Sequence, residues 1–305
     1  MRIRYLALSA ALLFGARPAI AQTVSDSTVQ TAGDTTLRMM RDTAMRRMGD
    51  TAAPTASDTA VHPTRDSTGG IAAQDIALGE AAAAALKPPA EALAHFQAAL
   101  ARDSTNYQAL CLATRATVAE AEYEPDKDKQ KDLYAQAEHY ARQAVAVRPD
   151  DAEGHFYLAF ALGRVALTKG KKDRVKYGKE VYQQAQQALK IKPDHPGALH
   201  VMGMWNAQVM SLSGFSRFMA KTFLGGGILG KASWDNAVHD MERAVQVDPK
   251  RLVHHLDLGT VYLETKQPEK ARQQFKLVVN GTPTEYNDRH YKEEAQKALD
   301  EMKKK

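Results

Sequence analysis

The sequence predicts an all-α fold, a solenoid of about five helix-turn-helix units with long inter-helix insertions and a C-terminal capping helix. Two observations carry this prediction. Four segments share an alanine followed five residues later by proline or serine, beginning at Ala99, Ala144, Ala188 and Ala244. Alanine, the residue with the highest helix propensity, is frequent throughout, whereas aromatic residues make up only 7% of the chain.

Residues 1–21 have the pattern of a secretory signal. Arg2 and Arg4 precede a short apolar core, and Ala19-Ile20-Ala21 supplies a small-residue cleavage site. The apolar run is shorter than the roughly 20 residues that a membrane-spanning helix needs. We therefore expect an exported protein, located in the periplasm or outside the cell after cleavage near Ala21.

Residues 22–70 form a linker with a repeat of its own. Aspartate recurs every eight residues from Asp26 to Asp66, each time followed by serine or threonine. With few large apolar side chains, this segment cannot offset the entropy of ordering, so we expect a disordered spacer. A glycosylated stalk and a weak cation-binding tail are alternatives.

Charge and cysteine content narrow the class of protein. Loss of Arg2, Arg4 and Arg17 with the signal would lower the formal charge from +5 to +2, which does not indicate nucleic-acid binding. Cys111 is the single cysteine, so no internal disulfide can form. Its apolar neighbours predict a buried structural thiol.

Residues 71–305 carry the helical repeats. In each alanine-marked segment, the small side chain lets two helices approach closely, and the later proline or serine lies in the turn to the next helix. The unit from Leu252 to Glu285 matches the tetratricopeptide repeat (TPR) most fully. Its motif residues, with a histidine at position 255 where tryptophan is usual, are Leu258, Gly259, Tyr262, Ala271, Phe275 and Pro283. The sequence thus resembles the TPR family.

The other units keep this frame but are longer. Successive proline or serine markers lie 45, 44, 56 and 34 residues apart. We therefore expect insertions between the helices of three units, at 120–132, 168–179 and 211–233. Residues 286–302 are expected to form the polar-faced capping helix that a solenoid needs.

The lengthened units also resemble the regulator of microtubule dynamics family. The likeness covers roughly residues 73–279 and includes Met204-Trp205-Asn206 and the segment from Trp234 to Pro249. It implies a TPR-like helical domain. Only the architecture is carried over, because an exported protein would not meet microtubules.

The TPR resemblance implies which side chains face the concave groove. In TPR proteins, particular positions of each unit's first helix line that surface. Carried over residue by residue, the expected ligand-groove residues are Gln108, Arg115, Glu153, Phe156, Phe160, Arg164, His200, Met204, Gln208 and Thr260. Aromatic and arginine side chains suit an extended peptide or protein segment.

No pattern in the sequence predicts catalysis, a cofactor or a metal. The ten histidines lack ligand spacing, and paired cysteines are absent. Residues 225–231 match most of a phosphate-binding loop, but Ala232 stands where the magnesium-binding hydroxyl is required. We therefore expect no enzyme.

Two functions stay open at this point. The first is an interaction scaffold in the cell envelope that binds a protein or peptide segment in the groove. The second is a lipid or membrane-surface carrier that uses the apolar, basic insertion 211–230. Its membrane contacts would be Phe215, Phe218, Phe223 and Leu224. Neither the partner's identity nor the oligomeric state can be derived from these residues.

Overall fold

The computed structural model describes residues 65–212 and 227–304, with side chains from Gly69 onward. The predicted signal at 1–21 and most of the predicted linker lie outside this range. So do Phe215, Phe218, Phe223 and Leu224. The first described helix begins at Arg65, six residues before the boundary expected at 71.

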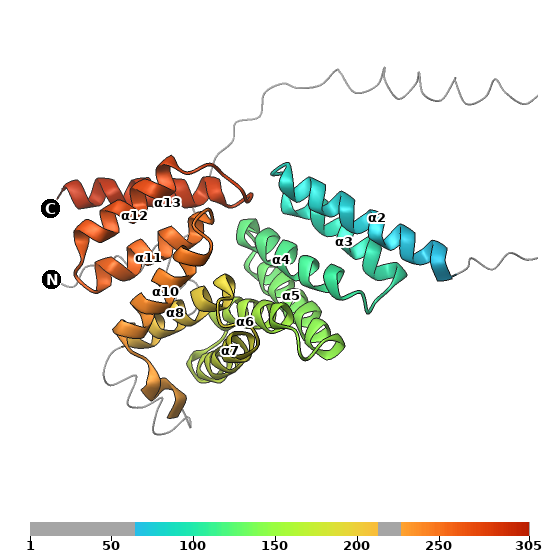
Figure 1. Ribbon diagram of the computed structural model, residues 1–305, viewed down its shortest axis with the longest axis horizontal. Coiled ribbons are helices and arrows are strands. Elements are labelled where there is room, and N and C mark those ends of the chain that lie inside the picture. The colour runs from blue at the N-terminus through green and yellow to red at the C-terminus, as the bar shows by residue number, and fades with distance from the viewer. Residues whose placement is uncertain (1–64, 213–226, 305) are drawn as a thin grey trace, which may run out of the picture. The chain divides into compact units, whose positions relative to one another are not determined.

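The described residues form α-helices, one short 3-10 helix and no strand (Figure 1). The helices are α2 (Arg65–Ala84), α3 (Pro89–Arg102), α4 (Tyr107–Tyr123), α5 (Lys127–Val147), α6 (Ala152–Leu167), α7 (Lys171–Ile191), α8 (Pro196–Ser211), η3 (Gly227–Lys231), α10 (Trp234–Val247), α11 (Leu252–Glu264), α12 (Pro268–Asn280) and α13 (Asp288–Lys303).

Consecutive helices pack as five pairs, which confirms the predicted solenoid of helix-turn-helix units. The pairs are α2 with α3, α4 with α5, α6 with α7, α8 with α10, and α11 with α12. Helix α13 packs on α12 and α11 as the capping helix. We call α2, α4, α6, α8 and α11 the first helices, and their partners the second helices.

The alanines that mark the repeats lie at the ends of second helices. Ala99, Ala144, Ala188 and Ala244 are all fully buried. In each case the backbone N–H four residues later donates to the alanine carbonyl, and the helix ends there. The marker found in the sequence is therefore a repeated helix end packed against its neighbours.

Polar side chains begin several first helices. Asn106 and Asp151 accept hydrogen bonds from backbone N–H groups in the first turns of α4 and α6, and His195 does so for α8 through its Nδ1. These bonds satisfy donors that a helix start leaves without a partner. Pro196 occupies the first position of α8, where its missing N–H is harmless.

Most of the extra length predicted as the first two insertions, 120–132 and 168–179, is helical. Helices α5 and α7 each have 21 residues, and only residues 124–126 and 168–170 join them to the preceding helices. Asp126 caps α5 by accepting from the N–H groups of Asp128 and Lys129. In the third insertion, Leu229 of η3 is 6% exposed and belongs to the core formed with α6, α7 and α8.

One buried hydrogen-bond pattern occurs in two units. His155 contacts Gln184 at 2.6 Å and the carbonyl of Pro149 at 2.7 Å. His255 contacts Gln274 at 2.7 Å and the carbonyl of Pro249 at 2.9 Å. Each histidine thus joins a first helix to its second helix and to the preceding turn. This explains how histidine can stand where the TPR motif usually has tryptophan.

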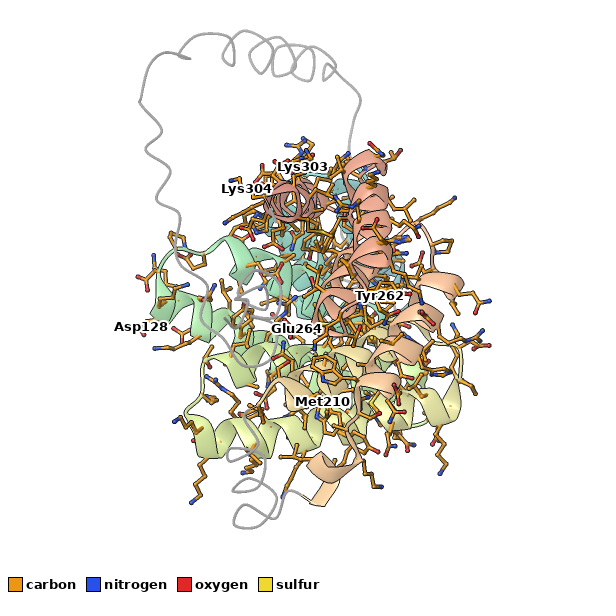
Figure 2. All side chains as sticks on the ribbon, turned by 90° about the vertical axis from the view of Figure 1, so that its left-hand side faces the viewer. Asp128, Met210, Tyr262, Glu264, Lys303 and Lys304 are labelled. Carbon is orange, nitrogen blue, oxygen red and sulfur yellow. The ribbon has the colours of Figure 1, made fainter. Side chains whose placement is uncertain are left out.

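Glycines at the crossing of paired helices leave no room for a methyl group. A Cβ at Gly259 would lie 2.6 Å from Phe275, and one at Gly203 would lie 2.5 Å from Met241. Figure 2 labels Tyr262 and Glu264, which follow Gly259 along α11. The close crossing expected from the TPR motif is therefore present.

We expect Gly259→Ala to lower the free energy of unfolding by about 1 to 3 kcal/mol, because Phe275 must move out of a packed core. Gly70 is the matched control, since a Cβ there would meet no atom within 4 Å. Gly70→Ala should raise the free energy of unfolding by about 0.5 to 1 kcal/mol. Urea titrations followed by circular dichroism measure both, and equal effects would contradict this account of the helix crossing.

Candidate functional site

A cavity of about 390 Å³ lies among the first helices. Its walls come from α2, α4, α6, α8 and α11, joined by α3, the turn 284–287 and Tyr291 of α13. Small residues hold part of the wall open, among them Ala116, Ala119, Ala159 and Gly163. A Cβ at Gly197 would lie 2.4 Å from the ring of Phe156, so the close packing of α8 on α6 needs glycine there.

Aromatic side chains of α6 form one wall. The Phe156 ring lies 6.1 Å from that of Phe160 and 4.8 Å from that of His195, centre to centre. Phe156 is buried and Phe160 is half-buried. A half-buried ring beside a cavity offers apolar surface to an entering side chain.

A buried ion pair joins two first helices beside this wall. Arg164 Nη2 lies 2.6 Å from Glu122 Oε1, and each side chain is 8% exposed. The Arg164 guanidinium also lies 5.3 Å from the centre of the Phe160 ring. The pair therefore positions the aromatic wall as well as linking α4 to α6.

Residues 284–287, which we call the closing turn, bring the C-terminal part of the chain to α4. Asn287 donates from its side-chain amide to Glu122, and the Tyr286 ring contacts the Tyr123 ring edge-on at 5.1 Å. Arg251 Nη2 lies 3.0 Å from Glu285. Residues more than 160 positions apart in the sequence thus line the same cavity.

The closing turn is itself held by Asp288. Its carboxylate accepts from the backbone N–H groups of Thr284 at 2.7 Å and Glu285 at 2.9 Å. Burial nevertheless raises the pKa of Asp288, and these hydrogen bonds oppose that rise. The first turn of α13 thereby fixes the backbone that presents Glu285, Tyr286 and Asn287.

A group of buried polar side chains lies where α8 meets α11. His200 Nε2 is 3.2 Å from the carboxylate of Asp257, and the rings of His200 and His254 meet edge to face at 4.8 Å. Within the described ranges, both nitrogens of His254, Nδ1 of His200 and Nε of Arg251 are buried without a hydrogen-bond partner. His200, His254 and Arg251 all line the cavity.

The environment of His254 keeps its imidazole neutral. Burial lowers its pKa well below the usual value, and the nearby His200 and Arg251 lower it further. A neutral imidazole has one N–H donor and one nitrogen acceptor. Both are buried at the cavity wall, where unsatisfied polar groups are unfavourable in the free protein.

The free energy of unfolding is expected to fall as the pH is lowered through about 6.5, the ordinary pKa of histidine. The unfolded chain then binds a proton at His254 that the folded chain excludes, so each pH unit below that value costs about 1.4 kcal/mol until the folded-state pKa is reached. Urea titrations between about pH 7.5 and pH 5.5 measure the slope. His254→Gln should reduce it, whereas substitution of the exposed His139 should not; equal slopes would refute a neutral buried His254.

The structure places the predicted groove residues in two groups. Six line the cavity: Arg115, Phe156, Phe160, Arg164, His200 and Met204. The remaining four do not line it: Gln108, Glu153, Gln208 and Thr260. A ligand-binding role for any of the ten stays a prediction.

Contacts elsewhere account for three of those four residues. Gln108 donates to Glu80 at 3.3 Å, and Glu153 lies 2.8 Å from His195 Nε2. The Thr260 hydroxyl donates to the carbonyl of Leu256 within α11. Gln208 is a buried residue of α8, with 4% of its surface exposed. Transfer of TPR positions assumes that every unit has the same helix lengths and packing. These units differ in both, so some of the transferred positions lie outside the cavity.

Sequence reasoning missed Glu122, Arg251, His254 and the closing turn. Glu122 and Arg251 lie near the end of α4 and just before α11, outside the transferred positions. His254 and His255 are adjacent in the sequence, so on a helix they point to different faces. His255 contacts Gln274 of the second helix, whereas His254 lines the cavity.

The structure also shows the surroundings of the single cysteine. Cys111 is 5% exposed, and burial raises the pKa of its thiol to about 12, so the thiol is protonated at neutral pH. In the described parts of the chain, no group of three histidine, cysteine or acidic side chains is arranged to hold a metal ion. None of the helices in residues 65–212 and 227–304 is long and apolar enough to span a bilayer.

Comparison with known families matches residues 80–303 to regulator of microtubule dynamics protein 1-3. The chain belongs to this family. Regulator of microtubule dynamics protein 1 of Bos taurus is 24% identical over 146 residues, which are 48% of this chain and 45% of that protein. The Pongo abelii protein is 23% identical over 172 residues, 56% of this chain and 54% of that protein. This family member thus spans about half the length of the curated relatives it matches.

The solved structure of TTC0263, a thermophilic TPR protein of Thermus thermophilus, is similar in fold. It matches with a TM-score of 0.53 and 17% sequence identity, covering 74% of this chain and 98% of that one. At this identity the likeness establishes the fold alone. The regulator of microtubule dynamics family member described here therefore has a TPR-like solenoid, as its sequence predicted.

Proposed function

We propose that this protein is a non-enzymatic interaction scaffold whose cavity binds an extended segment of a partner protein. The TPR-like fold suggests protein–protein interaction. The observation that carries the proposal is the cavity itself, which combines a half-buried aromatic wall with polar groups that lack partners. A bound segment would cover the aromatic wall and form hydrogen bonds with the unpaired polar groups.

The proposal is tested with a random-peptide library displayed on phage and selected against the full chain. Selected peptides are synthesised with a fluorescent label, and their binding is measured by anisotropy. We expect Phe160→Ala to weaken binding at least about tenfold, because truncation of an aromatic hot-spot residue costs about 2 kcal/mol or more.

Leu277→Ala is the matched control for that experiment. Leu277 is 51% exposed and lies on the second helix α12, away from the cavity lining. Its replacement should leave peptide binding unchanged. Failure to select any peptide, or equal losses in both variants, would argue against binding in the cavity.

We further propose that the protein acts outside the cytoplasm, in the cell envelope. The support is the signal pattern of residues 1–21 and the small-residue cleavage site that ends at Ala21. Expression of the full chain in a bacterial host should therefore yield a secreted form that begins at Gln22. Intact mass spectrometry identifies this species, and a cytoplasmic protein retaining residues 1–21 would contradict the proposal.

A further inference from the structure

Several hydrogen-bond donors in the cavity wall have no partner among the described residues. Arg115, on α4, has no hydrogen bond or ion pair within residues 65–212 and 227–304. Arg251 uses one nitrogen for Glu285 and leaves Nε without a partner. His254, which is 1% exposed, leaves its ring N–H unpaired. An arginine has five N–H donors and no acceptor, so this surplus favours a ligand rich in acceptors.

These donors come from two elements of the cavity wall. Arg115 lines the cavity from α4, and Arg251 and His254 line it from the start of α11. The backbone N–H of His254 donates to the carbonyl of Arg251 at 3.1 Å, so these two side chains leave the same turn. Positive charges with unused donors in the wall of an apolar cavity suit a negatively charged group.

The acidic side chains nearby do not use this capacity. Glu122 is engaged by Arg164 and Asn287, and Glu285 by Arg251 Nη2. Asp257 is fully buried beside His200 and is not part of the cavity lining. Glu80, the third acidic residue of the lining, accepts from Gln108 at 3.3 Å, so the acidic side chains of the wall leave Arg251 Nε and the ring nitrogens of His254 without a partner.

We propose that the partner segment is acidic, and that an aspartate or glutamate carboxylate of the segment binds Arg115, Arg251 and His254. Apolar side chains beside that carboxylate contact Phe160 and Met204, which line the same cavity. The unpaired Oδ1 of Asn287 in the closing turn accepts a backbone N–H of the segment. This inference rests on the proposed function and specifies the chemistry of its ligand.

The peptide selection tests this inference through the composition of the selected sequences. We expect them to share an acidic residue flanked by apolar residues. Replacement of that residue by its amide, Asp by Asn or Glu by Gln, should weaken binding about tenfold to 100-fold, because hydrogen bonds to charged groups contribute about 1.5 to 3 kcal/mol. This comparison uses the unaltered protein and does not depend on the folding of any variant.

Arg115→Met then locates the carboxylate. This substitution should weaken binding of the acidic peptide as strongly as the amide replacement does. It should have little effect on binding of the amide peptide. Arg289→Met is the control, because Arg289 is exposed on α13 and does not line the cavity. Thermal melts followed by circular dichroism verify that both variants are folded.

Several results would overturn the inference. If selected peptides lack an acidic residue, or bind equally well as amides, while Phe160→Ala still abolishes binding, the proposed function stands and the acidic specificity is wrong. If no peptide is selected, both are wrong. Displacement of the peptide by vesicles of anionic phospholipid, or a dimer in sedimentation that Arg115→Met dissociates, would assign the cavity to a lipid or to a second copy of the chain.

Discussion

Arg164→Met is expected to lower the free energy of unfolding by about 3 to 5 kcal/mol, the usual effect of removing one partner of a buried ion pair. The Glu122 side chain is 8% exposed, so its carboxylate would be buried without a cation. Glu122 also accepts a hydrogen bond from Asn287 of the closing turn. The loss should therefore appear in α4 and α6 and in the contact between α4 and the closing turn. Urea titrations followed by circular dichroism measure the free energy.

Two further variants make this prediction specific. Arg102 pairs with Asp75 at 2.7 Å, but its side chain is 41% exposed. Arg102→Met should change stability by less than about 1 kcal/mol, because solvent screens exposed pairs. The double variant Arg164→Met with Glu122→Leu should recover most of the loss, since apolar side chains of similar volume often replace buried pairs without penalty. Equal effects of the two arginine variants would contradict the buried-pair account.

Trp205→Ala should lower the free energy of unfolding by about 3 to 5 kcal/mol, the range for removing a buried large aromatic side chain. Trp205 is fully buried and packs on Tyr182 with ring centres 4.6 Å apart. Its indole N–H donates to the carbonyl of Gly178 at 2.7 Å, which joins α8 to α7. Hydrogen exchange should show the largest increase in α7 and α8.

Trp205→Phe separates the packing from the hydrogen bond. It keeps an aromatic ring against Tyr182 but cannot donate to Gly178, so we expect a smaller loss that includes about 1 kcal/mol for the hydrogen bond. Leu277→Ala, at a side chain that is 51% exposed, should change stability by less than about 0.5 kcal/mol. A loss in Trp205→Ala no larger than in Leu277→Ala would show that this contact does not stabilise the junction.

Local sequence signals predicted the repeat architecture well. Ala99, Ala144, Ala188 and Ala244 end four second helices, and the residues around Gly259 and Phe275 form the predicted close crossing. Such features depend on side chains near one another in the sequence. The extra length in α5 and α7 was less predictable, because lysine-rich and glutamine-rich segments are compatible with both loops and exposed helix turns.

The site was predictable only in part. Transfer of TPR positions found the wall residues Phe156, Phe160 and Met204, because they lie on first helices in the ordinary frame. It did not find the contact of Asn287 with Glu122, which joins residues 165 positions apart. Contacts of this kind depend on the superhelical path of the whole array, to which every helix length contributes.

The central claim is that the cavity among the first helices holds the partner segment. Hydrogen–deuterium exchange of the full chain, with and without a saturating selected peptide, tests it most directly. We expect protection in α4, α6, α8, α11 and the closing turn, which supply the cavity wall. Protection confined to the second helices α5, α7, α10 and α12, or no protection at saturation, would contradict the claim.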